Sequence, residues 1–385
     1  MSNALYLSSR PNLEHYKKLA KELLRAPAGV GSEPIEQLWQ RHKKPDPCKL
    51  ADVQFFLARA HGFASWPKFA KHVEALERAN SPVSQFEAAA DAIVGGDLPA
   101  LRQLLRENPD LVRARSTRSH RSTLLHYVSA NGVEDYRQRT PPQIVEITRF
   151  LLDAGADVNA ESDAYGGHST ALNLTATSGH PEEAGLQIPL LELLLERGAL
   201  IDGPDGSSTV NACLRNGRGQ AAEWLASRGA SLDLEGASGV GRLDLVAQLV
   251  NGASIEDAAN GLAWACEYGR LEVVDFLLQQ GVSVTPPDAR PTGLHWAAHT
   301  GRADLVKLLL AHGAPAQVIE SRFQGTPLEW ALHGWSESSG ESEGWYEVVA
   351  LLIQAGVEPH PNWAENAKVK ADPRMLAALR GEWNQ

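Results

Sequence analysis

Three side chains suited to proton transfer recur at equivalent places in the C-terminal half of the chain. Glu267, His299 and His333 each lie three residues after a tryptophan, in the segments WACE, WAAH and WALH. A carboxylate and an imidazole that share a ligand can act as general base and general acid, with Arg215 holding an anionic group near Tyr268. These five residues are the candidates for catalysis. Their types and spacing do not indicate tuned pKa values, so we favour a protein without enzymatic activity.

Metal and cofactor motifs are scarce in this sequence. His295 and His299 lie four residues apart on an expected helix, which is a spacing that suits two metal ligands. There is no acidic calcium loop, no P-loop and no G-x-G-x-x-G. Cys48, Cys213 and Cys266 have neither disulfide nor zinc spacing. We therefore expect no metal site and no cofactor.

The elements that would position the candidate residues form an internal repeat. Segments of the form x-L-x-x-A-x-x-x-G recur and are each followed by an apolar helix and a Gly-Ala or Gly-Val pair. The clearest copy is RPTGLHWAAHTGRADLVKLLLAHGA at residues 290–314. Thr292 can cap its first helix, Gly301 makes the turn, and Gly313 ends the second helix. The spacing therefore predicts two short helices per unit, joined by a tight turn.

The repeated lines resemble the ankyrin repeat. DAGADVNAES at 153–162 and TGLHWAAHTGR near 300 are the nearest matches to its pattern. The resemblance implies an all-α solenoid of helix–turn–helix units with short β-hairpin fingers and a concave face lined by the first helices. In that family the histidine of the first helix, here His126 and His295, bonds to backbone and ties adjacent fingers. This role is favoured over metal binding, and the usual partner of the family is another protein.

Three regions are expected along the chain. Residues 1–82 would form an N-terminal helical cap domain, with helices near 12–26, 35–44, 49–63 and 65–76. Residues 83–362 would hold about eight repeat units, and residues 363–385 a C-terminal helical cap. Three insertions between first and second helices are expected at 132–142, 180–187 and 336–344. The HGFASW run resembles a helical segment of bacterial ankyrin proteins.

One face of each first helix is a candidate binding surface. At 100° per residue, Leu294, Ala297 and Ala298 share the packed face, whereas Trp296 and His299 share the opposite one. The same registration, with one finger residue, gives the candidate partner-binding residues Tyr127, Asn131, Tyr165, Arg215, Asn216, Trp264, Glu267, Tyr268, Trp296, His299, Trp330 and His333. The tryptophans either wall an aromatic groove or pack sideways on each other. A shift of one residue in this helical registration would bury the tryptophans instead.

Two glycines in one first helix are unusual. Gly236 and Gly239 each cost roughly 1 kcal/mol relative to alanine in a helix interior, and both are expected on the concave side. Together with a short finger they would leave a hollow in the floor of the groove. The alternative is a degenerate, partly unwound repeat.

Charge and hydropathy limit the partners. The net charge of −11 argues against nucleic acid, and no apolar run approaches a membrane span or a signal peptide. A cytoplasmic protein follows by default. We expect a protein or peptide partner on a concave, Trp-lined groove. The alternative is a small organic ligand, bound or converted around Arg215, Gly236, Trp264, Glu267, Trp296 and His299.

Overall fold

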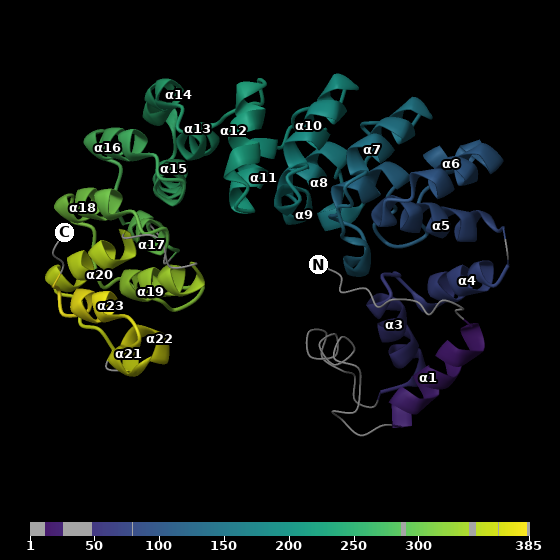
Figure 1. The fold of residues 1–385 in the computed structure, drawn as a ribbon, viewed down its shortest axis with the longest axis horizontal. Helices are drawn as coiled ribbons and strands as arrows, with labels where there is room; N and C mark the ends of the chain where they lie inside the picture. Colours follow the sequence, from purple (N-terminus) through teal and green to yellow (C-terminus); the bar gives the residue numbers. More distant parts are fainter. Residues whose placement is uncertain are drawn as a thin grey trace. The chain divides into compact units, whose positions relative to one another are not determined.

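The computed structural model describes residues 12–25, 48–78, 80–285, 290–338, 344–360 and 362–382. The chain divides into two compact units, Met1–Leu225 and Ala226–Gln385. The boundary falls within helix α12 (Gly219–Ser227), inside the predicted repeat array (Figure 1). The helix expected at 35–44 and residues 339–343 of the third insertion lie outside the described residues.

The first unit begins with three helices, α1 (Leu13–Arg25), α3 (Leu50–Ala60) and α4 (Trp66–Leu76). They match three of the predicted N-terminal helices, because apolar residues recur at helical spacing and bury one stripe of each. Tyr16 of α1 and Phe69 of α4 pack edge to face, with ring centroids 4.9 Å apart. Helix α4 also packs on α5, so this segment continues into the repeats.

Helix pairs fill the rest of the first unit. They are α5 (Pro82–Gly95) with α6 (Leu98–Glu107), η2 (Leu124–Ser129) with α7 (Ile144–Asp153), α8 (Ala171–Thr177) with α10 (Gln187–Glu196), and α11 (Thr209–Arg215) with α12. Short helical turns lie between them: η1 (Pro109–Arg113), η3 (Asp135–Arg137), η4 (Ala164–Gly166) and α9 (Gly179–Glu183).

The first helices start where the sequence offers a capping oxygen. Thr170 and Ser208 each accept a hydrogen bond from the backbone N–H three residues later. One element differs from expectation, because η2 is a 3₁₀ helix. The residue that follows it, Ala130, has a left-handed backbone conformation (φ 47°). The insertion that follows folds back under this helix, where the Tyr127 hydroxyl donates to Glu134 Oε1 (3.3 Å).

The second unit is two layers of helices. One layer holds the first helices α13 (Leu234–Val240), α15 (Ile255–Glu267), α17 (Gly293–His299) and α19 (Pro327–Glu337). The other holds the second helices α14 (Leu243–Leu249), α16 (Leu271–Gln279), α18 (Ala303–Ala311) and α20 (Gly344–Gln354). Neighbours within each layer pack against each other, and the core lies between the layers.

Three short helices and one 3₁₀ turn complete this unit. They are η5 (Val250–Gly252), α21 (Asn362–Glu365), α22 (Ala367–Lys370) and α23 (Pro373–Ala378). Helix α23 packs on α20, and Val369, Met375 and Ala378 are buried in the core of the unit. The predicted turn glycine Gly301 has φ +68°, which fits the left-handed conformation that glycine adopts without strain.

The fingers contain little β structure. Among the described residues, the one isolated bridge joins Ser162 to Ser169 in the finger that carries Tyr165. The other fingers are turns. The predicted all-helical repeat architecture is confirmed, with turns where short hairpins were expected.

Candidate functional site

A cavity of ≈ 550 Å³ opens in the second unit beside the first helices α17 and α19. We call it the aromatic pocket, and it is lined by Trp296, His299, Arg322, Phe323, Gln324, Gly325, Glu329, Trp330, His333, Ser336, Glu337 and Trp363. Four predicted binding residues, Trp296, His299, Trp330 and His333, therefore meet at one place. The finger residues 322–325 and Trp363 of α21 add walls that the sequence analysis did not assign to a site.

Trp330 lies at the centre of the aromatic pocket. Its ring meets Trp296 at 4.9 Å and 84°, His299 at 5.7 Å and 79°, and Phe323 at 5.8 Å and 66°, measured between centroids. Such edge-to-face contacts are the preferred aromatic geometry. Trp330 is only 8% exposed, which agrees with the alternative in which the tryptophans pack sideways on each other. The groove wall and the sideways packing, which were expected as alternatives, occur together here. The tryptophans pack on each other and still form the wall of a cavity.

A buried carboxylate shapes the finger that forms one wall. Glu320 is 1% exposed and accepts hydrogen bonds from the backbone N–H groups of Arg322 (2.5 Å), Phe323 (2.7 Å) and Gly325 (3.2 Å). Burial alone would raise the pKa of Glu320, but the backbone donors lower it below its usual value. This carboxylate therefore holds the turn that presents Phe323, which is 64% exposed, to the pocket.

Polar groups at the mouth of the pocket are mostly exposed. His333 Nδ1 lies 3.5 Å from Glu337 Oε2, and both side chains are more than half exposed. The His299 and His333 rings lie 5.8 Å apart. No group of three or more His, Cys, Asp and Glu side chains within the described ranges could hold a metal ion. The wall is therefore aromatic and the rim carries both acidic and imidazole groups.

The two histidines expected to tie fingers do so. His295 Nδ1 accepts from Thr292 N–H (3.1 Å), and its Nε2 lies 3.2 Å from the Gly325 carbonyl of the next finger. His126 makes the equivalent bonds to Thr123 N–H (3.1 Å) and to the Ser169 carbonyl (3.1 Å). Burial lowers the pKa of His126 to about 4, so this ring is neutral at physiological pH. The structural interpretation of both histidines is confirmed.

Comparisons with known proteins found similarity to a sequence model and to a solved structure. A sequence model described as ankyrin repeats (3 copies) matches residues 234–317 and 262–362. This part of the chain consists of ankyrin repeats. The crystal structure of the human ASB11 ankyrin repeat domain is also similar, with 22% sequence identity and a TM-score of 0.38. That match covers 71% of this chain and 99% of the ASB11 chain. A comparison with curated proteins finds no match.

Two expectations about the ankyrin first helices were wrong. Tyr127 is fully buried, because Glu134 from the following insertion lies beneath it, so it does not face a groove. Gly236 and Gly239 are buried rather than open to a hollow. Helix α13 packs closely on α15, where a Cβ at Gly261 would lie 2.9 Å from Ser238 Oγ. The small residues of this repeat therefore serve close helix packing.

Glu267, one of the catalytic candidates, has a shifted acidity. Burial raises the pKa of its carboxyl from 4.5 to about 7. It lies at the end of α15, near the half-buried Trp264 and Tyr268. The expected grouping of Glu267 with Arg215 and Asn216, which are exposed at the end of α11, joins residues of two different units and stays a prediction.

The raised pKa of Glu267 predicts a pH-dependent effect of Glu267→Gln. Glutamine mimics the protonated acid, so the variant should match the wild type below about pH 4.5 and become more stable as pH rises through about 7. The expected gain at pH 8 is at most about 3 kcal/mol. Urea unfolding at pH 4.5 and pH 8 measures it. Glu272→Gln, on the exposed side of α16, is the control, and equal stabilities at both pH values would contradict the burial of Glu267.

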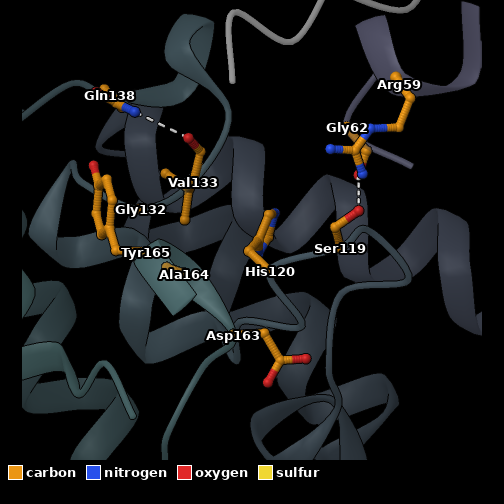
Figure 2. A pocket seen from close by; sticks show the side chains of 10 residues that line it. All are labelled: Arg59, Gly62, Ser119, His120, Gly132, Val133, Gln138, Asp163, Ala164 and Tyr165. Atoms are coloured by element: carbon orange, nitrogen blue, oxygen red, sulfur yellow. Dashed lines mark hydrogen bonds between the residues drawn. The ribbon is translucent and has the colours of Figure 1, made fainter. Parts of the chain in front are cut away.

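A second cavity, of ≈ 320 Å³, lies in the first unit, and Figure 2 shows the side chains around it. We call it the polar pocket, and it is lined by Arg59, Gly62, Ser119, His120, Gly132, Val133, Gln138, Asp163, Ala164 and Tyr165. Tyr165 is 62% exposed, and its hydroxyl donates to Asn131 Oδ1 (2.5 Å). Two predicted binding residues therefore meet beside this pocket. The Gly62 carbonyl accepts hydrogen bonds from both Ser119 N–H and Ser119 Oγ.

The backbone around the polar pocket is strained. Four non-glycine residues of this region have φ between 47° and 57°, namely Arg121, Ala130, Tyr165 and His168. Each such conformation costs on the order of 1 kcal/mol and persists only where its surroundings impose it. Gly132, Val133 and Gln138 of the first insertion line the pocket together with Tyr165.

A buried ion network holds that insertion, and the sequence analysis missed it. Arg118 pairs with Glu87 (Nη1 to Oε1, 2.6 Å) and with Glu134 (Nε to Oε1, 2.8 Å), and Arg137 pairs with Glu87 (Nη1 to Oε2, 2.7 Å). All four side chains are at most 10% exposed. The network reaches the polar pocket through His120, whose Nε2 lies 3.3 Å from Glu134 Oε1. The only sequence signal was the mixture of acidic and basic residues in the insertion.

Proposed function

We propose that this chain binds a protein or peptide partner and that the aromatic pocket receives one side chain of that partner as an anchor. The observation that carries the proposal is the meeting of Trp296, Phe323, Trp330 and Trp363 around one cavity of ≈ 550 Å³. Buried aromatic anchors in well-formed pockets dominate the energy of many interfaces. Ankyrin repeats generally serve as protein-binding modules, which agrees with this assignment.

Exposed apolar groups beside the pocket favour a peptide over a free small molecule. Ile319 is 56% exposed and Phe323 is 64% exposed, and both belong to the finger that walls the pocket. Apolar surface that continues beyond a cavity suits an extended partner, whereas a small ligand would be enclosed. Glu267 does not line the aromatic pocket, so this pocket does not support acid–base chemistry between Glu267 and the histidines His299 and His333.

A random peptide library selected against the full chain tests this function. Selected peptides should change tryptophan fluorescence and should bind Phe323→Ala at least about 10-fold more weakly, because the variant removes a pocket wall that the partner's anchor contacts. Ile255→Ala is the matched control, since Ile255 is 77% exposed in the same unit and does not line the aromatic pocket. Selected peptides that lose no affinity for Phe323→Ala would overturn the assignment of this pocket.

We further infer that residues 1–82 and 363–385 cover the two ends of a repeat array at 83–362. Packing of α4 on α5 and of α23 on α20 supports this, since terminal repeats need a polar covering.

The net charge of −11 supports a partner other than nucleic acid. None of the described helices has the length and apolar character needed to cross a membrane. The cytoplasmic location and the bacterial origin both stay predictions.

A further inference from the structure

Acidic residues dominate the unit that contains the aromatic pocket. Residues 226–385 hold 20 Asp and Glu against 11 Lys and Arg, so most of the net charge of −11 belongs to this unit. Two of these carboxylates, Glu329 and Glu337, line the pocket itself. A field of one sign attracts partners of the opposite sign and accelerates their association.

We propose that the aromatic pocket recognises a cation, the guanidinium of an arginine in a basic peptide segment. This inference rests on the proposed peptide-binding function and names the side chain that serves as anchor. Trp296 and Trp330 meet at 84°, so the pocket has ring walls in two nearly perpendicular planes. A cation near an aromatic face is attracted by the ring quadrupole, most strongly by that of tryptophan.

The chain itself places cations on aromatic rings near this pocket. The Arg322 guanidinium carbon lies 5.0 Å from the centroid of the Phe323 ring, at the pocket wall. Lys368 Nζ lies 4.9 Å from the centroid of Trp335, in the same helix as Trp330. These intramolecular contacts show the geometry that an arginine of a partner would reproduce inside the pocket.

The carboxylates of the pocket distinguish a cation from an apolar anchor. Both bonds from Thr326 to Glu329 use Oε2, and Oε1 makes no hydrogen bond among the described residues. Glu337 is 64% exposed in the absence of a partner. An apolar side chain would bury these carboxylates without a donor, at a cost in desolvation. A guanidinium has a planar fork of donors for carboxylates and a flat face for stacking, whereas a lysine ammonium lacks both.

Three short peptides test the inference on the full chain by ¹H–¹⁵N NMR of the indole N–H groups. They share a Gly-Ser frame and carry a central arginine, a central citrulline or a central leucine. Citrulline has nearly the shape of arginine without its charge. We expect the arginine peptide to shift the Trp296 and Trp330 resonances and to bind at least about 10-fold more tightly than the citrulline peptide.

Two exposed positions supply charge variants that should leave the fold intact. Glu337→Gln should weaken the arginine peptide several-fold and leave the leucine peptide unchanged. Arg322→Gln should strengthen arginine binding, because it removes a like charge from the wall. Equal affinity for arginine and citrulline, or tighter binding of leucine, would overturn the cation assignment while peptide binding stands. If none of the three peptides shifts an indole resonance and no library peptide binds either, the proposed function fails as well.

Discussion

Replacing Glu134 with glutamine should destabilise the first unit by about 3–5 kcal/mol, because it removes one partner from a buried ion network. Glu134 is 1% exposed, and Arg118 and Arg137 lie at most 3% exposed beside it. In the variant these two cations would keep only Glu87 as a buried counter-charge. An uncompensated charge in a low-dielectric interior costs far more than the loss of an exposed pair.

Urea unfolding followed by circular dichroism, with hydrogen exchange of the segment 118–151, measures this loss and assigns it to the first unit. Glu146→Gln is the control. Its carboxylate lies 3.9 Å from Arg102, with both side chains at least half exposed, so less than about 0.5 kcal/mol is expected. A Glu134→Gln variant as stable as this control would show that the network contributes nothing to folding.

The same pair of proteins should differ with pH. Burial alone would raise the pKa of Glu134, but Arg118, His120 and Arg137 together outweigh it and hold the pKa well below the usual 4.5. A carboxyl with a lowered pKa stabilises the fold above the unfolded value, near pH 4.5, and loses this contribution as pH falls through the folded value. The advantage of wild type over Glu134→Gln should therefore be full at pH 7 and shrink below about pH 4.5.

Trp330→Ala is expected to cost about 3–5 kcal/mol in the stability of the second unit, as large core truncations do. The ring is 8% exposed and touches His295, Trp296, His299 and Phe323. Its loss leaves a void between α17, α19 and the finger that carries Phe323. Thermal unfolding and urea titration both report the loss.

Phe323→Ala is the matched control for Trp330→Ala, since it removes a ring of the same cluster that is 64% exposed. A stability change below about 1 kcal/mol is expected for it. If Trp330→Ala were equally mild, Trp330 would be a ligand-facing side chain rather than the packed centre of the pocket. The two variants thus separate the structural role of Trp330 from the binding role of the pocket wall.

The local pattern of the chain predicted most of its helices. Helix boundaries and helix faces depend on residues close together in the sequence. Examples are the capping residues Thr170 and Ser208, the turn glycine Gly301 and the apolar stripes. The finger-tying role of His126 and His295 followed from the resemblance to the ankyrin repeat. The bond that each Nδ1 accepts is local, whereas the carbonyl beside each Nε2 belongs to the next finger. The column of tryptophans also pointed to the correct part of the site.

Errors arose where a residue from another segment decides what a side chain faces. Helical registration placed Tyr127 on an open face, but Glu134 of the insertion, seven residues later, covers it. The same registration predicted a hollow at Gly236, but this glycine is buried and helix α13 packs against α15. A periodicity of 100° per residue gives a direction on one helix and says nothing about what lies in that direction.

Local spacing was enough to predict the repeat and the helix pairs, and the family resemblance added the histidine ties. Composition gives the acidic excess of residues 226–385, but the boundary of that unit comes from the folded chain. The meeting of Phe323 and Trp363 with Trp330 at one pocket, and the buried network of Glu87, Arg118, Glu134 and Arg137, appear only in the folded chain. These contacts join finger, insertion and helix. Ion pairing and ring packing require side chains within a few ångströms, and that proximity arises only when the segments fold together.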